Sequence, residues 1–231
     1  MAFGSQKAVG MMSLALIAVS VLPAEVRLEA RHKHFNGSCT GVLAVNEQGI
    51  SYRGAKKHAW RWKYQEIQEL KLAANSIRVL TYQDRRMHLG ADEAYEFQGT
   101  FPGELYALWR DRLDQRFVAA LTDGQLQPRW RIAAKHLARF AGSHGELEVG
   151  RDRIAFATDR KDDSRTWRFA DIENISRSGP FQLTITTFER ARFHYGDRKD
   201  FNFQLKEALS EARYDELWRS IQRGNGRIQR P

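Results

Sequence analysis

The strongest constraint on the fold is that one residue pattern occurs twice in the chain. The stretches 62–82 and 167–187 carry aromatic and apolar side chains in the same order. Three positions match at one fixed offset: Trp62 with Trp167, Tyr64 with Phe169, and Ile67 with Ile172. A chain that repeats its apolar positions over this length is expected to repeat a structural module.

The match extends to both sides of these stretches. Residues 41–45 correspond to 145–149, and residues 95–97 correspond to 201–203. The Tyr, Leu and Trp residues around Trp109 recur around Trp218. We therefore interpret the chain as a tandem duplication. The expected organisation is a leader at 1–24, a first module at 25–121, a linker at 122–132, a second module at 133–223 and a flexible tail at 224–231.

Alternation of apolar and polar side chains predicts short strands in each module. In the second module the expected strands are 134–140, 146–149, 153–157, 166–169, 172–176, 182–187, 192–195 and 201–204. Each module then changes to helical spacing, through Leu105 to Phe117 in the first and Leu205 to Ile221 in the second. The segment 127–140 also has the spacing of a basic amphipathic helix, but its match to the first copy favours a strand.

These elements predict a mainly β fold with some helix. Each module would contain about seven short antiparallel strands, curled into a barrel or an orthogonal sandwich and closed by one C-terminal helix. Aromatic rows facing inward in both copies indicate core packing and not stacking platforms for ligands. The expected core anchors are Trp62, Tyr64, Trp109, Trp167, Phe169 and Trp218.

Strands closed by a C-terminal helix with a central tryptophan resemble the pleckstrin-homology (PH) superfold, including its bacterial and GRAM-like relatives. Trp109 and Trp218 stand where that family places its helix tryptophan. Many members bind phosphoinositides through a basic motif in the first hairpin. The corresponding turns here, 46–49 and 150–152, lack that motif, so the resemblance implies the fold and a binding role without this ligand.

Charge and cysteine content restrict the function further. The chain has 231 residues, a net charge of +9 and one cysteine, Cys39. An intramolecular disulfide is therefore impossible. The spread of basic residues favours anionic partners, although it would also keep the protein soluble.

The first 24 residues differ from the rest. Lys7 precedes an uncharged apolar run at 8–22, and Ala24 offers a small residue at the cleavage position. This pattern indicates a secretory signal peptide, with an uncleaved membrane anchor as the alternative. The sequence thus predicts an extracytoplasmic protein, periplasmic or secreted.

The sequence offers few residues for chemistry. His32 and His34 lie two apart, so on a strand they would share a face, and Cys39 could add a third metal ligand. The second copy has His136, Ala138 and Ser143 at these positions. No nucleophile or phosphate-loop motif is present. We therefore expect neither enzymatic activity nor a cofactor, and treat the metal site as a weak candidate.

Basic side chains in matching turns and strands suggest a binding surface. The candidates for contact with an anionic partner are Lys56, Lys57, Arg61, Lys63, Arg160, Lys161, Arg165 and Arg168. The sequence therefore favours a non-enzymatic binding or scaffold module for an anionic lipid surface, a peptide or a protein partner. A basic nucleic-acid-binding protein is the alternative, and a small metal-dependent enzyme at the His32, His34 and Cys39 group comes third.

Overall fold

The computed structural model describes residues 25–226, with gaps at 35–36, 56–57, 86–90, 139–140, 161–162 and 192–196. The expected leader and the strand expected at 192–195 lie outside the described residues. So do three cationic candidates, Lys56, Lys57 and Lys161. Neither described helix has the length and apolar character that crossing a bilayer requires.

The described chain is mainly β-structure with two helices. The N-terminal half contains β1 (Glu25–His34), β2 (Gly37–Asn46), β3 (Gly49–Gly54), β4 (Ala59–Lys63), β5 (Ile67–Ala73), β6 (Ser76–Asp84), β7 (Asp92–Gln98), α1 (Glu104–Leu113) and β8 (Phe117–Ala120). The C-terminal half contains β9 (Trp130–Leu137), β10 (Ser143–Val149), β11 (Arg153–Ala157), β12 (Arg165–Arg168), β13 (Ile172–Ser176), β14 (Gln182–Arg190), β15 (Arg198–Leu205) and α2 (Glu211–Gly224).

Most segments with alternating side chains form strands. The segment 127–140 contains β9, so the strand interpretation is confirmed over the amphipathic helix. The helix predicted for the first module, through Leu105 to Phe117, is longer than the observed one. Helix α1 ends at Leu113, and Phe117 begins β8. Asp114 has a φ of 47°, a left-handed value that an α-helix does not contain. The chain therefore leaves the helix one turn before the apolar spacing ends.

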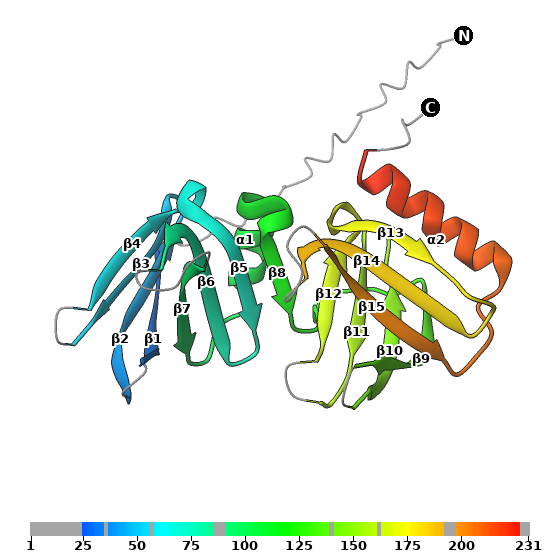
Figure 1. Ribbon diagram of the computed structural model, residues 1–231, viewed down its shortest axis with the longest axis horizontal. Coiled ribbons are helices and arrows are strands. Elements are labelled where there is room, and N and C mark those ends of the chain that lie inside the picture. Colours follow the sequence, from blue (N-terminus) through cyan, green and yellow to red (C-terminus); the bar gives the residue numbers. More distant parts are fainter. Residues whose placement is uncertain are drawn as a thin grey trace, which may run out of the picture.

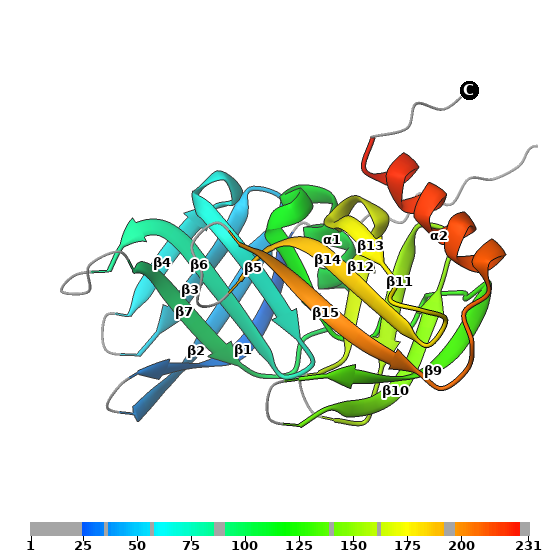
Figure 2. The ribbon, with the colours of Figure 1, turned by 45° about the vertical axis from the view of Figure 1, so that its right-hand side comes forward.

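All strands belong to one hydrogen-bonded sheet, in the order β13-β14-β15-β9-β10-β11-β12-β8-β5-β6-β7-β1-β2-β3-β4. The two sides of β8 have the same strand order. The N-terminal half reads β5-β6-β7-β1-β2-β3-β4, and the C-terminal half reads β13-β14-β15-β9-β10-β11-β12. Figure 1 shows the two strand sets side by side with β8 between them, and Figure 2 shows the same arrangement from another side.

The expected closed barrels do not form. Closing the N-terminal half would require β4 to pair with β5, but the open edge of β5 is occupied by β8, which pairs with it in parallel. Closing the C-terminal half would require β12 to pair with β13, but β12 pairs with β8. The sheet therefore stays open because one short strand occupies an edge of each half.

Each half has its own apolar core. Trp62, Tyr64, Trp167 and Phe169 are all buried, as their alternation with charged neighbours suggests. Trp109 is fully buried on α1, which lies between the halves in both views (Figures 1 and 2). The inward rows of both copies therefore fill two separate cores.

Trp218 is the exception among the expected core anchors, because 38% of it is exposed. The helix α2 lies over β13 (Figure 1) and buries Leu217 and Ile221 completely. Successive residues of a helix point about 100° apart, so Trp218 lies at the margin of the buried face. The prediction that it anchors the core is wrong.

The strand β8 joins the halves through backbone and side-chain contacts. All four of its residues are buried. Just beyond it, the hydroxyl of Thr166 on β12 donates to the Leu121 carbonyl at 2.8 Å and accepts from the Asp123 amide at 3.0 Å. Thr166 is itself buried, so these hydrogen bonds cannot be replaced by water.

Replacing Thr166 with Val should therefore destabilise the junction. The change keeps the shape of the side chain but leaves a buried amide and carbonyl unpaired, at a cost of about 2 kcal/mol. Urea unfolding of the full chain measures this loss. Thr184→Val is the matched control, since the Thr184 hydroxyl bonds Asn202 in an exposed position. Equal losses in both variants would contradict a special role for Thr166.

Candidate functional site

The structure does not bring together on one surface those cationic candidates that it describes. Arg61 and Lys63 are exposed on β4, at one end of the sheet. Arg160 donates to the carbonyls of Ala141 and Gly142 within its own half. Arg165 is buried and Arg168 is half-buried. The expectation that both β12 arginines are exposed to a partner is therefore wrong. Arg165 packs on the Phe201 ring beside Glu189, and Arg168 is bound to Asp171 and to backbone carbonyls of the other half.

Arg165 belongs to a buried charge cluster at this junction. Glu189 on β14 lies 3.5 Å from the Arg165 guanidinium and 3.1 Å from the Lys199 ammonium. Burial, together with the nearby charges of Arg165 and Lys199, lowers the pKa of Lys71 on β5. Burial and Arg165 also lower the pKa of Lys199. Two carboxylates, Glu189 and the more distant Glu69, thus lie near three cations, which indicates a structural role for Arg165.

The variant Glu189→Gln should be strongly destabilised. Removing the acidic partner of a buried ion pair typically costs about 3 kcal/mol, because the remaining charge is left uncompensated. The native-state pKa values of Lys71 and Lys199 lie below the ordinary lysine value of 10.5, so in the pH range between the lowered and the ordinary pKa the unfolded chain binds more protons. Stability then rises with pH in that window. Unfolding at neutral and alkaline pH should show the loss shrinking as the lysines deprotonate. A loss that grows with pH would contradict this assignment.

A groove lined with arginines lies where α1, the turn before β11, the corner after β12 and the end of α2 meet. Its volume is about 940 Å³. Its arginines are Arg110, Arg151, Arg153, Arg168 and Arg223, and its acidic residues are Asp111 and Asp152. The excess of arginines over aspartates makes this groove, called the arginine groove below, a positively charged hollow.

Contacts between the halves build the floor of the arginine groove. The Arg168 guanidinium donates to the Arg110 carbonyl at 2.6 Å and the Asp114 carbonyl at 2.5 Å. It also pairs with Asp171 at 2.5 Å. Burial raises the pKa of Asp171, while the ion pair with Arg168 opposes that rise. Arg168 therefore fixes α1 against the corner after β12.

Helix α2 closes the groove from the other side. A side chain at Gly224 would lie 2.5 Å from Cβ of Phe169, so only glycine lets the helix end approach this closely. The approach brings Arg223, in the last turn of α2, to the groove wall. A cation is favoured there because the C-terminal end of a helix carries partial negative charge.

Two of the arginines are not neutralised by the groove's own acids. Arg110 pairs with Asp111, and Arg153 pairs with Asp152 and Asp123. Arg151 and Arg223 form no ion pair with another described residue. A guanidinium stays charged at all physiological pH values and matches phosphate or carboxylate oxygens with paired N–H groups. The groove therefore has spare capacity to bind an anion.

The histidine and cysteine candidates lie at the opposite end of the N-terminal half. His34 and Cys39 come together with His58, which precedes β4, and one possible ligand atom from each lies within 4.8 Å of the others. His32 lies beside them, its ring centroid 4.6 Å from that of His34, and its Nδ1 contacts the Glu96 carbonyl at 3.1 Å. The metal-ligand group expected from the sequence thus includes His58 in place of His32.

Of the residues in these two sites that were not predicted, only His58 could have been found from the sequence, and only with the strand order known. His58 directly follows Lys56 and Lys57, so in the sequence it belongs to a basic turn and shows no ligand spacing to His34 or Cys39. Strand pairing from β2 through β3 to β4 returns this position to Cys39. The groove residues Arg151 and Arg223 had no signal, because they are distant in sequence and belong to different elements.

No protein-family model matches the sequence, and no curated protein matches it. Among solved structures, the chain is similar to the Spt16D Pob3N heterodimer, with 10% identity, a TM-score of 0.32 and coverage of 72% of this chain and 85% of that chain. It is similar to the C-terminal domain of an unknown protein from Leishmania infantum, with 13% identity, a TM-score of 0.29 and coverage of 42% and 83%. It is also similar to the DH/PH domains of a RhoGEF mutant, with 5% identity, a TM-score of 0.30 and coverage of 46% and 32%. These TM-scores are too low to assign a fold or a function.

Proposed function

We propose that this protein is a non-enzymatic binding module that holds a phosphate-like anion of its partner in the arginine groove. The observation that carries the proposal is the pair of unneutralised cations, Arg151 and Arg223, which line one hollow of about 940 Å³. This volume lies within the range of roughly 300 to 1,000 Å³ that is usual for ligand sites. A lipid headgroup and a phosphorylated peptide share this anionic chemistry.

The geometry supports binding over catalysis. Arg110, Arg153 and Arg168 are held by carboxylates and backbone carbonyls, which gives the groove a rigid wall. Arg151 and Arg223 then supply charge from two separate elements, so an anion between them would connect the turn before β11 to α2. Guanidinium groups bind and orient anions through their N–H groups, but they do not act as general acids or bases near neutral pH because they stay protonated.

Reversing both free charges tests the proposal. The double variant Arg151→Glu and Arg223→Glu should lose binding to vesicles that contain phosphatidylserine or a phosphoinositide, compared with neutral phosphatidylcholine vesicles. Each basic residue at an anionic membrane contributes about 1 kcal/mol, so removing two corresponds to a loss of about 30-fold or more. Binding of the unmodified protein should weaken as salt rises. Inorganic phosphate should compete if a single headgroup is held.

The matched control is Arg61→Glu with Lys63→Glu, which makes the same change in net charge on β4. This control should retain binding. If it loses binding while the groove variant keeps it, the anion binds at the β4 surface and the groove assignment is wrong. Duplex DNA binding with the same loss in the groove variant would instead support the nucleic-acid alternative.

We also propose that the two halves descend from one duplicated module related to the PH superfold. The matched strand order on either side of β8 supports the duplication. So does the pairing of a glycine with a facing ring in each half: Gly41 lies against Tyr52, and Gly145 lies against Phe156. Separate expression of the halves would test whether each is a folding unit.

Export is the remaining part of the proposal, and it is supported by the uncharged run at 8–22 after Lys7. Protein purified from its native host should begin near Glu25 on N-terminal sequencing, because cleavage after Ala24 would remove the leader. A cytosolic product that begins at Met1 would contradict export.

A further inference from the structure

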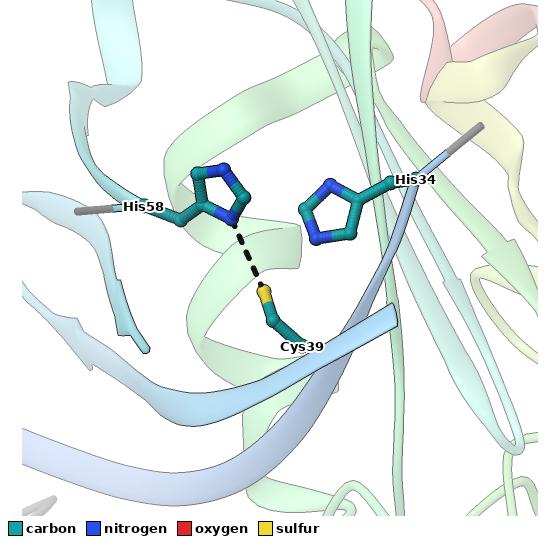
Figure 3. Close-up of side chains that lie close together, drawn as sticks. All are labelled: His34, Cys39 and His58. Atoms are coloured by element: carbon teal, nitrogen blue, oxygen red, sulfur yellow. Dashed lines mark hydrogen bonds between the residues drawn. The ribbon is translucent and has the colours of Figure 1, made fainter. Parts of the chain in front are cut away.

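Three potential metal ligands converge at the end of the N-terminal half where the β1–β2 hairpin meets the start of β4. Figure 3 shows the imidazole rings of His34 and His58 turned toward each other above the Cys39 sulfur. We propose that His34, Cys39 and His58 form a binding site for a thiophilic metal ion of the zinc(II) or copper(I) type. This site is independent of the arginine groove.

The distances suit ligands that share one ion. Sγ of Cys39 lies 3.4 Å from Nδ1 of His58. A sulfur and a nitrogen bound to one tetrahedral zinc ion lie about 3.5 Å apart, given bond lengths of about 2.3 and 2.0 Å. The ring centroids of His34 and His58 are 4.5 Å apart. Small side-chain rotations would therefore bring all three ligand atoms onto one ion.

The surroundings hold the ligands in place. The amide of Gly54 donates to the His58 carbonyl at 2.7 Å, and the Trp60 ring stacks on the His58 ring with an interplanar angle of 18°. The Tyr52 hydroxyl donates to the Cys39 carbonyl at 3.0 Å and lies 3.5 Å from the Cys39 sulfur. Contacts of this kind orient metal ligands in known sites.

Two glycines make room for this arrangement. A Cβ atom at Gly41 or at Gly54 would lie 2.8 Å from the Tyr52 ring. The absence of a side chain at these two glycines therefore lets the Tyr52 hydroxyl reach Cys39.

The corresponding residues of the C-terminal half are joined by hydrogen bonds to a carboxylate. There, Ser143 pairs with His136 as Cys39 pairs with His32 in the strand register. Asp163 accepts a hydrogen bond from Ser143 and contacts His136 at 3.3 Å. A carboxylate thus satisfies the histidine and the hydroxyl of that half.

In the N-terminal half an imidazole occupies the place of that carboxylate. The described cluster of His34, Cys39 and His58 contains no acidic group. Imidazole and thiolate are the ligands that zinc and copper(I) prefer over magnesium or calcium. Three protein ligands also leave one coordination position open, as in zinc sites that bind a further ligand.

Metal titration of the full chain tests the proposal. Cobalt(II) is the probe for a zinc-type site, since a bound thiolate gives a sulfur-to-cobalt charge-transfer band. Copper(I) is titrated separately against a colorimetric chelator. One equivalent of either metal should bind to the unmodified protein and raise its melting temperature, because a ligand that binds only the folded state stabilises it. Cys39→Ser should abolish the charge-transfer band, and His58→Asn should weaken binding at least tenfold.

His136→Asn is the matched control, because it alters the corresponding histidine of the other half and should leave metal uptake unchanged. Circular dichroism of each metal-free variant establishes that it is folded. If Cys39→Ser does not fold, His34→Gln provides the second variant. The proposal is overturned if the unmodified protein takes up neither metal, if uptake survives both Cys39→Ser and His58→Asn, or if His136→Asn removes it equally.

Discussion

The strand β8 is the constraint on which the architecture depends. Its four buried residues pair with β5 on one side and β12 on the other, so each half lends one sheet edge to its neighbour. Neither half can then close its own ring of strands. The same connection holds α1 against the corner after β12, where Arg168 binds the backbone of α1. The arginine groove exists because these elements of both halves meet there.

Much of the strand content could be predicted, because side chains of a strand alternate between two faces and the chain records that alternation twice. The aromatic rows at Trp62 and Trp167 identified the inward face in each half. The strand β8 could not be predicted in this way. Phe117, Val118, Ala119 and Ala120 are all apolar, and a short uniform run does not distinguish a buried strand from the end of a helix.

Alternation also fails to say whether an outward face remains in water. Arg168 does face away from the buried Trp167 on the same strand, but its guanidinium binds backbone carbonyls of Arg110 and Asp114 in the other half. Trp218 shows the converse. Its helical spacing put it on the apolar side of α2, but the part of α2 that packs on the sheet is narrower than that apolar side.

The candidate sites were predictable only where their residues share one strand or hairpin. The spacing of His34 and Cys39 around the β1–β2 turn gave two of the three clustered ligands, and His58 required knowledge of strand order. The arginine groove required knowledge of how α1, β12 and α2 pack. Long-range packing of this kind has no periodic signature in the sequence.

The open sheet leaves two end strands, β4 and β13, and they are protected differently. An end strand exposes unpaired backbone groups that can recruit a strand from another molecule, and charged side chains discourage this. Exposed Arg61 and Lys63 give β4 such protection, whereas α2 lies over β13. In the intact chain, the edges of β5 and β12 that face the junction are occupied by β8. A break between the halves would therefore create adhesive edges, and self-association of the fragments would compete with their folding.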